Sequence, residues 1–317
     1  MLMNHKKCLP DTVLMETEYK DTAWIVKDLL PPGLSLIAGK PKAGKSFLCL
    51  DMGAHIAEGI PFLGKASQKG EVIFISLEDD ERIIRRNRGN LWNTKGIPNL
   101  YYLTDFPKGA QAITELNGII QSNPELKLIV IDIIGCIIQY VSGDQSNRYD
   151  FISHTLDQFK QILKGTDVSI MMVHHVGKKD YALSQDKILG STAYQGKVDT
   201  FWILEDKGTA YSLIINGKVI SGQQELSLTR GKDQPFSVIL PPDPTPTEIN
   251  KLLEFINSSN EALGPKQISK IMDKDTNIIG QMLYRLINQG LIAKLGKGQY
   301  VSLDFEQRTK YYSPFNN

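Results

Sequence analysis

The stretch LSLIAGKPKAGKSFLCLDMGAHIAEG, residues 34–59, decides the fold of this chain. The apolar residues that open it predict a buried strand, and the amphipathic run that begins at Phe47 predicts a helix. Between the two lies the pattern G-x-x-x-x-G-K-[ST], in which backbone N–H groups and a helix N-terminus surround phosphate oxygens. The residues that match it are Gly39, Gly44, Lys45 and Ser46. The stretch therefore predicts a P-loop.

A P-loop assigns a role to each of its polar side chains. Lys45 is expected to reach the β- and γ-phosphates of ATP, and the Ser46 hydroxyl is expected to bind Mg²⁺. We expect the whole loop to contact the nucleotide. Its residues are Gly39, Lys40, Pro41, Lys42, Ala43, Gly44, Lys45, Ser46 and Phe47.

Composition excludes several other classes of protein. The 317 residues are 41% hydrophobic, enough for one large domain and a smaller one. Lys and Arg number 36 and Asp and Glu 35, so any contact with nucleic acid must come from local patches. Three widely spaced cysteines predict neither a disulfide framework nor a zinc site, and no signal peptide or transmembrane helix is evident. We expect a cytoplasmic protein without a membrane partner.

Strands that alternate with helices predict a parallel sheet. After the P-loop strand, buried strands are expected at Glu71 to Leu77, Leu126 to Ile131 and Val168 to Val173. Four later strands follow without helices between them, so we expect the sheet to finish in antiparallel hairpins. These are Thr200 to Leu204, Tyr211 to Ile215, Glu225 to Leu228 and Phe236 to Leu240.

Four prolines between residues 241 and 246 predict a stiff linker and a domain boundary. Beyond them lie three helical patterns, at Thr247 to Ile256, Pro265 to Met272 and Thr276 to Asn288, and then two short apolar runs. Three helices and a hairpin predict a winged helix. Its third helix is polar enough for a DNA groove, but winged helices also bind proteins, and the sequence leaves both open.

Two carboxylates follow predicted strands, at the edge where functional groups of parallel sheets gather. Asp132 ends an apolar strand, the position of a Walker B residue that holds Mg²⁺; a helix cap is the alternative. Hydrolysis also needs a group that activates water, and Ile133 cannot supply it. We expect Glu78 to do so, with Asp79 and Asp80 better suited to capping the next helix, although Glu78 could belong to that cap.

His174 and His175 close the fourth predicted strand. One of them is expected to sense the γ-phosphate, and the pattern does not show which. A structural or metal-binding pair is the alternative, but adjacent strand residues point to opposite faces, which disfavours a metal.

Two groups of cations receive different interpretations. Arg85, Arg86 and Arg88 lie on the helix after Glu78 and are interpreted as a solvated face. A second group occupies the loop after the histidine pair, where it is a candidate site for a DNA backbone or simply a lysine-rich loop. Its members are Lys178, Lys179 and Lys187.

The order and separation of these motifs resemble a known family. WIVKDLLPPGLSLIAGKPKAGKS, VIFISLEDDERIIRR, LIVID, MMVHHVGK and GSTAYQGKVDTFWILE together resemble the RecA-fold ATPases of the RepA kind, across about residues 20–240. These ATPases are relatives of the DnaB-type hexameric replicative helicases and are frequent on plasmids, phages and integrated elements. The resemblance implies an α/β, RecA-like fold for the ATPase domain (21–241). The residues themselves predict the rest of the chain, which is an N-terminal arm (1–20), a linker (242–246), a winged helix (247–304) and a tail (305–317).

The resemblance also implies roles for these residues. Lys45 and Ser46 would bind the nucleotide and Mg²⁺, Glu78 would be the catalytic carboxylate, Asp132 the Walker B acid, and the histidine pair would hold the sensor. Loops after Asp132 and after the histidine pair would face a channel that holds single-stranded DNA.

Rings of this family complete each site with a basic finger from the next subunit. Arg230 ends a late strand and is our choice, while Lys218 lies in an equally plausible turn.

The sequence thus predicts a hexameric, ATP-driven helicase that acts on single-stranded DNA during replication of a mobile element or phage. A replication initiator or primase of the same element is a possible partner. The alternative is an ATP-dependent DNA-binding or recombination-mediator ATPase that does not unwind DNA. A repressor-like regulator that acts through the winged helix is a weaker third interpretation.

Overall fold

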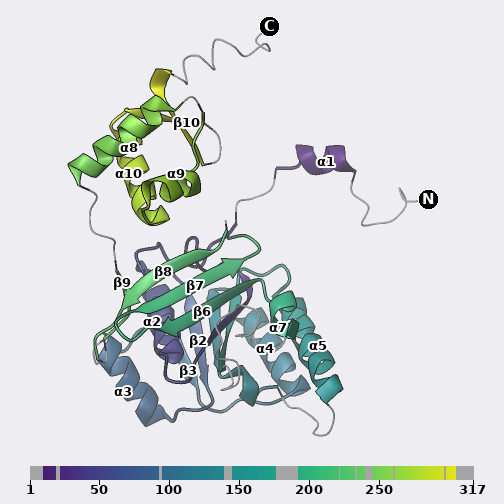
Figure 1. Ribbon diagram of the computed structural model, residues 1–317. Helices are drawn as coiled ribbons and strands as arrows, with labels where there is room; N and C mark the ends of the chain where they lie inside the picture. Colours follow the sequence, from purple (N-terminus) through teal and green to yellow (C-terminus); the bar gives the residue numbers. More distant parts are fainter. Residues whose placement is uncertain are drawn as a thin grey trace. The chain divides into compact units, whose positions relative to one another are not determined.

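The chain divides into two compact units, residues 1–239 and 240–317. The computed structural model describes residues 10–18, 22–92, 95–138, 145–175, 192–220, 222–232, 234–239, 245–259, 261–295 and 298–304. The first unit contains the predicted P-loop and is built around one large sheet (Figure 1). No helix in the described ranges is long and apolar enough to cross a membrane.

Strands and helices alternate through most of the first unit. In chain order its elements are α1 (Asp11–Glu16), β1 (Gly33–Gly39), α2 (Lys45–Glu58), β2 (Glu71–Ser76), α3 (Glu81–Trp92), β3 (Leu100–Leu103), α4 (Ala110–Ser122), β4 (Leu126–Asp132), the short 3₁₀ helix η2 (Ile134–Cys136), α5 (Gln145–Leu163), β5 (Ser169–His175), α7 (Thr192–Lys197), β6 (Thr200–Asp206), β7 (Tyr211–Gly217), β8 (Gln224–Thr229) and β9 (Ser237–Val238).

The sheet has nine strands in the order β3-β2-β4-β5-β1-β6-β7-β8-β9. Neighbouring strands from β3 to β6 pair in parallel, and β6 to β9 pair antiparallel. The predicted fold, a mostly parallel sheet that finishes in antiparallel hairpins, is therefore confirmed. The P-loop strand β1 lies between β5 and β6, so the edge at which β1, β2, β4 and β5 end can gather side chains from four segments of sequence.

Both faces of the sheet are covered, which explains why the parallel strands read as continuous apolar runs. Along β5, Met171 and Val173 pack into the core under α2, whereas Ile170 and Met172 pack into the core under α4 and α5. Figure 1 shows these helices on opposite sides of the sheet. Alternate residues of a strand thus belong to different cores, as the two-residue period requires.

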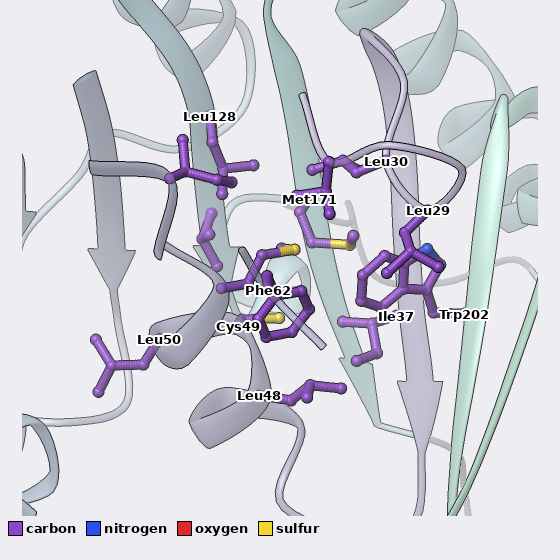
Figure 2. Packing of buried hydrophobic residues seen from close by; sticks show 14 of the residues in the cluster. Leu29, Leu30, Ile37, Leu48, Cys49, Leu50, Phe62, Leu128, Met171 and Trp202 are labelled. Carbon is purple, nitrogen blue, oxygen red and sulfur yellow. The ribbon is translucent and has the colours of Figure 1, made fainter. Parts of the chain in front are cut away.

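The core under α2 holds the P-loop helix against the sheet. Leu48 and Cys49 of α2 pack with Ile37 of β1, Met171 of β5 and Trp202 of β6, and all five are fully buried (Figure 2). Burial of a large apolar side chain contributes roughly 1.5–3 kcal/mol. The helix that begins at Lys45 is therefore fixed relative to the strands that carry the other site residues.

Five elements of the first unit were not predicted. They are α1, β3, α4, η2 and α7, of which η2 has three residues, β3 has four, and α1 and α7 have six each. Such short patterns carry little periodicity, and α4 buries only Ala112, Leu116 and Ile120. Helix α5 begins at Gln145 with a polar first turn.

The second unit contains α8 (Pro246–Ser258), α9 (Pro265–Met272), α10 (Thr276–Asn288) and the antiparallel strands β10 (Ile292–Leu295) and β11 (Gln299–Ser302). A capping box joins Thr245 and Glu248 at the start of α8. The helices enclose a small core of their own that includes Leu252, Ile268 and Leu283. Three helices followed by a hairpin is the predicted order; its assignment as a winged helix stays a prediction.

Candidate active site

The predicted P-loop connects β1 to α2. Gly44, directly before the helix, has a positive φ of 94°, a conformation that favours glycine. Gly39 ends β1 where a Cβ atom would lie 2.4 Å from the Leu204 carbonyl oxygen of β6. Backbone geometry therefore requires glycine at both Gly39 and Gly44, in addition to any requirement of phosphate binding.

Lys45 is folded into the loop. Its side chain donates hydrogen bonds from Nζ to the carbonyl oxygens of Gly39 (3.0 Å) and Lys40 (2.9 Å), and only 2% of the residue is exposed. Burial lowers the pKa of Lys45 to about 8, although the nearby Asp132 carboxylate acts in the opposite direction. The ammonium group is thus held at the loop and has little solvation to lose when a phosphate binds.

Asp132 lies at the end of β4, opposite the first turn of α2. Burial raises its pKa to about 6, and a hydrogen bond with the Ser46 side chain opposes that shift. The Oδ1 atom of Asp132 is buried and has no hydrogen-bond partner in the described parts of the chain. A buried carboxylate oxygen without a partner, next to a hydroxyl, is a donor set suited to Mg²⁺. The residues predicted to hold the metal are thus brought together, and they fit it.

Glu78 and His175 also meet at this edge. The Glu78 carboxylate is half exposed, and its Oε2 atom lies 3.4 Å from Nε2 of His175. Glu78 acts on the pKa of both Asp132 and Lys45, which places its charge within reach of the site. A carboxylate that is oriented by a histidine and accessible to solvent can activate a water molecule.

The structure shows that Asp80, and not Glu78, caps α3. Asp80 accepts hydrogen bonds from the backbone N–H groups of Arg82 and Ile83, each at 3.0 Å, so Asp80 is the capping residue. The expectation that Asp79 also suits the cap is wrong. Asp79 instead lines a small cavity together with Ser46 and Asp132, and burial and the charge of Glu78 raise its pKa. Sequence analysis did not identify Asp79 as a site residue, because a run of three acidic residues does not indicate which of them points into the site.

The two histidines point to opposite faces. His175 continues the α2 face of β5, where it contacts Glu78 and affects the pKa of Asp132. The His174 ring lies on the other face, 5.0 Å from the Tyr194 ring of α7. Within the described parts of the chain, no group of three His, Cys, Asp or Glu residues could hold a metal ion. Of the pair, His175 is therefore the one at the candidate site.

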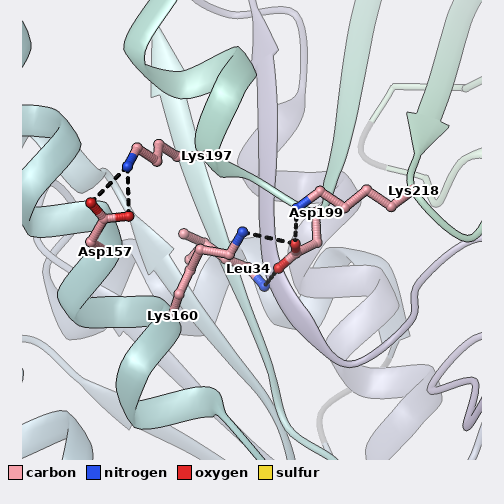
Figure 3. A network of polar contacts seen from close by, with 6 residues as sticks. All are labelled: Leu34, Asp157, Lys160, Lys197, Asp199 and Lys218. Carbon is pink, nitrogen blue, oxygen red and sulfur yellow. Dashed lines mark hydrogen bonds and ion pairs between the residues drawn. The ribbon is translucent and has the colours of Figure 1, made fainter. Parts of the chain in front are cut away.

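Arg230 and Lys218, the two candidates for a basic finger, lie at different ends of the sheet. The Arg230 guanidinium stacks on Phe47 of α2 and Phe236, with 4.4 Å and 5.2 Å to the ring centroids. Lys218 donates to Asp199 at 2.7 Å, and Asp199 also accepts from the Leu34 N–H at the start of β1 (Figure 3). Lys218 is thus engaged at the edge away from the P-loop, whereas Arg230 lies beside the P-loop.

Two groups of basic residues from the sequence analysis remain, the lysines after His175 and the arginines of α3. The three lysines expected to bind DNA, Lys178, Lys179 and Lys187, lie outside the described residues. Arg85 and Arg88 of α3 line a cavity of about 440 Å³ together with Tyr102, whose hydroxyl is buried. The interpretation of this helix face as merely solvated is therefore incomplete.

Comparison with known proteins agrees with this geometry. The family model AAA_25, described as an AAA domain, matches residues 7–181, more than half of the chain. No curated protein sequence matches.

Two solved structures are similar to the chain. One is described as "The Structure Of A DnaB-Like Replicative Helicase And Its Interactions With Primase", with a TM-score of 0.52 and 14% identity over 65% of this chain and 58% of that one. The other is described as an ATPase domain, with a TM-score of 0.46 and 14% identity over 62% and 81% of the respective chains. The alignment thus spans less than two thirds of the DnaB-like helicase, and at this identity it shows a shared RecA-like fold.

Proposed function

This chain belongs to the AAA_25 family of AAA domains, and from that premise we propose that it is an ATP-hydrolysing hexameric motor that moves on single-stranded DNA. Its setting would be the replication of a mobile element or phage. The observation that carries the proposal is the convergence of Lys45, Ser46, Asp132, Glu78 and His175 at one edge of a RecA-like sheet.

The chemistry follows from what each side chain can do. Lys45 and the N–H groups at the start of α2 hold the phosphates, and their positive charge compensates the charge that develops on the leaving phosphate. Ser46 and Asp132 would hold Mg²⁺, which when bound neutralises charge on the β- and γ-phosphates. Glu78 orients and deprotonates water, and His175 holds the Glu78 carboxylate in position.

Motor action on DNA is assigned here to two segments. β4 and β5 end at the nucleotide edge, at Asp132 and His175, so a change at the phosphates can reach the points from which these two segments continue. The second of these loops carries Lys178, Lys179 and Lys187, which we propose as contacts to the DNA backbone. The DnaB-like helicase with a similar fold interacts with primase, which supports a primase or initiator as a partner here.

A second candidate function is an ATPase that assembles on DNA without separating strands. The same site would serve either function, because nucleotide-driven assembly and translocation both need hydrolysis. The near-neutral composition, 36 basic against 35 acidic residues, is consistent with DNA contacts confined to a local patch in both cases.

A forked-duplex assay separates the two functions. Purified protein is incubated with ATP, Mg²⁺ and forks that carry a 5′ or a 3′ single-stranded arm, with the Lys45→Ala variant as the control for contaminating helicase. The motor predicts release of the labelled strand from one of the two forks. DNA-stimulated ATP hydrolysis without strand release from either fork would favour the mediator.

A further inference from the structure

Arg230 lies directly on the P-loop of its own chain. A Cβ atom added to Gly44 would be 2.7 Å from Nη1 of Arg230 and 2.9 Å from the Phe236 ring. The guanidinium group therefore occupies the space next to the residue that precedes Lys45. This contact brings together the end of β8 and the start of α2, which are separated by most of the sequence.

The environment of Arg230 fixes the guanidinium group, and among the described residues no opposite charge pairs with it. Phe47 and Phe236 offer ring faces at 4.4 Å and 5.2 Å, within the range of cation–π attraction. No carboxylate and no hydrogen-bond acceptor in the described ranges pairs with Arg230. A guanidinium group stacked on rings keeps its N–H donors in its own plane, free for an anion such as a phosphate.

The anion that this arrangement fits is the nucleotide held by the same loop. The backbone of a P-loop cradles the α- and β-phosphates, while the lysine reaches toward the γ-phosphate. We propose that Arg230 binds the α/β-phosphate region of the nucleotide in its own chain, with Phe47 and Phe236 as the residues that position it. The inference rests on the proposed nucleotide site and adds a second cation to it.

This role differs from a finger donated to a neighbouring subunit. A finger in trans acts on the γ-phosphate of the next chain and contributes nothing to binding of ADP by a single chain. Arg230 acting in cis instead contributes to ADP affinity without any assembly. The two roles therefore make opposite predictions for isolated chains.

Equilibrium binding of ADP with Mg²⁺ tests the difference, at a dilution where light scattering shows single chains. Removal of a charge-assisted hydrogen bond predicts that Arg230→Ala binds ADP about 10- to 100-fold more weakly. Arg230→Lys keeps the charge but loses the planar stack, so it should recover part of the affinity. The matched control is Lys232→Ala, which removes one exposed cation two residues further along and should bind like the wild type. Thermal melts of each variant show that the fold is intact.

A mixing experiment gives the second test. Arg230→Ala and Glu78→Gln chains are combined under assembly conditions, and ATP hydrolysis is measured at an ATP concentration too low to saturate Arg230→Ala. A residue that acts in cis leaves every site in the mixture deficient, so no activity should return. Recovery of hydrolysis on mixing, or wild-type ADP affinity in single Arg230→Ala chains, would overturn the inference.

The Lys45→Ala variant distinguishes this failure from failure of the proposed function. If Lys45→Ala loses ADP binding while Arg230→Ala does not, the nucleotide site stands and only the role of Arg230 is wrong. If the wild type binds ADP no better than Lys45→Ala, the proposed nucleotide site is wrong, and the inference about Arg230 is wrong as well.

Discussion

The Oε2 atom of Glu78 lies 3.4 Å from Nε2 of His175 at the edge of the sheet, although the two residues are 97 positions apart in the sequence. The contact exists because β2 and β5 end at the same edge, with β4 and Asp132 between them. It joins a carboxylate that can activate water to a strand that continues into the proposed DNA-binding loop. We therefore propose the Glu78–His175 pair as the point at which hydrolysis is coupled to DNA contact.

Lys45→Ala and Glu78→Gln should have different defects. Loss of Lys45 removes the cation that holds the phosphates, so ATP binding should be lost. Glu78→Gln keeps the phosphate site but loses the base, so ATP should stay bound while hydrolysis falls by about 10²–10⁴. Equilibrium ATP binding and phosphate release measure the two effects.

The neighbouring acids provide the control for that prediction. Asp80→Asn changes the cap of α3 and should leave the hydrolysis rate near that of the wild type. A wild-type rate in Glu78→Gln together with loss of hydrolysis in Asp79→Asn would assign the base to Asp79, which also lines the site.

The two histidines should respond differently to the same substitution. His175→Gln removes the group that positions Glu78, and kcat for ATP hydrolysis should fall about 10- to 100-fold with little change in ATP affinity. His174→Gln, on the opposite face beside Tyr194, should keep a kcat close to that of the wild type. Equal losses in both variants would contradict the assignment of His175.

Asp132 should lower stability at neutral pH in the absence of nucleotide. Burial raises its pKa to about 6 in the folded chain, above the ordinary value of 3.8. Between these values the folded chain retains a proton that the unfolded chain has released, so the free energy of unfolding falls as the pH rises through that window. Above pH 6, the raised pKa of Asp132 lowers the free energy of unfolding by about 3 kcal/mol.

Asp132→Asn should therefore gain roughly 1–3 kcal/mol in free energy of unfolding at pH 7.5, and this gain should shrink toward pH 4.5. Urea denaturation at the two pH values measures it, with Asp105→Asn as an exposed control. The same variant should lose ATP hydrolysis, because it lacks the charge needed for Mg²⁺. A gain that does not depend on pH would contradict the proposed cause.

The lysines after His175 should carry the contacts to single-stranded DNA. Replacing Lys178, Lys179 and Lys187 with alanine should weaken binding about equally across sequences. The log–log salt slope should decrease by about 0.7 for each phosphate that the variant no longer neutralises. DNA-stimulated ATP hydrolysis should fall more than the basal rate.

Deletion of residues 245–317 tests the alternative location of the DNA site. If the second unit only recruits the protein to an origin or a partner, the deletion should preserve stimulation by single-stranded DNA. Loss of single-strand binding in the deletion variant, with normal binding in the triple alanine variant, would place the DNA site in the second unit.

Sequence alone determined the P-loop, the long buried strands and the change from parallel strands to hairpins. The P-loop follows from the spacing of Gly39, Gly44, Lys45 and Ser46, because each position has a backbone or phosphate requirement that few residues meet. The strand that ends in Asp132 and the change from parallel strands to hairpins follow from apolar runs and from what separates them. These features depend on neighbours in the chain, so they can be read from it.

Only the tertiary structure decided which of several adjacent residues faces the site. His174 and His175 are equivalent in sequence, and the strand order places α2 on the face of His175. The same holds for Asp79, which turns into the cavity, and for Asp80, which caps α3. The contact of Arg230 with Gly44 depends on how β8 and α2 approach across the sheet. Such choices result from packing between distant segments, and no local pattern encodes them.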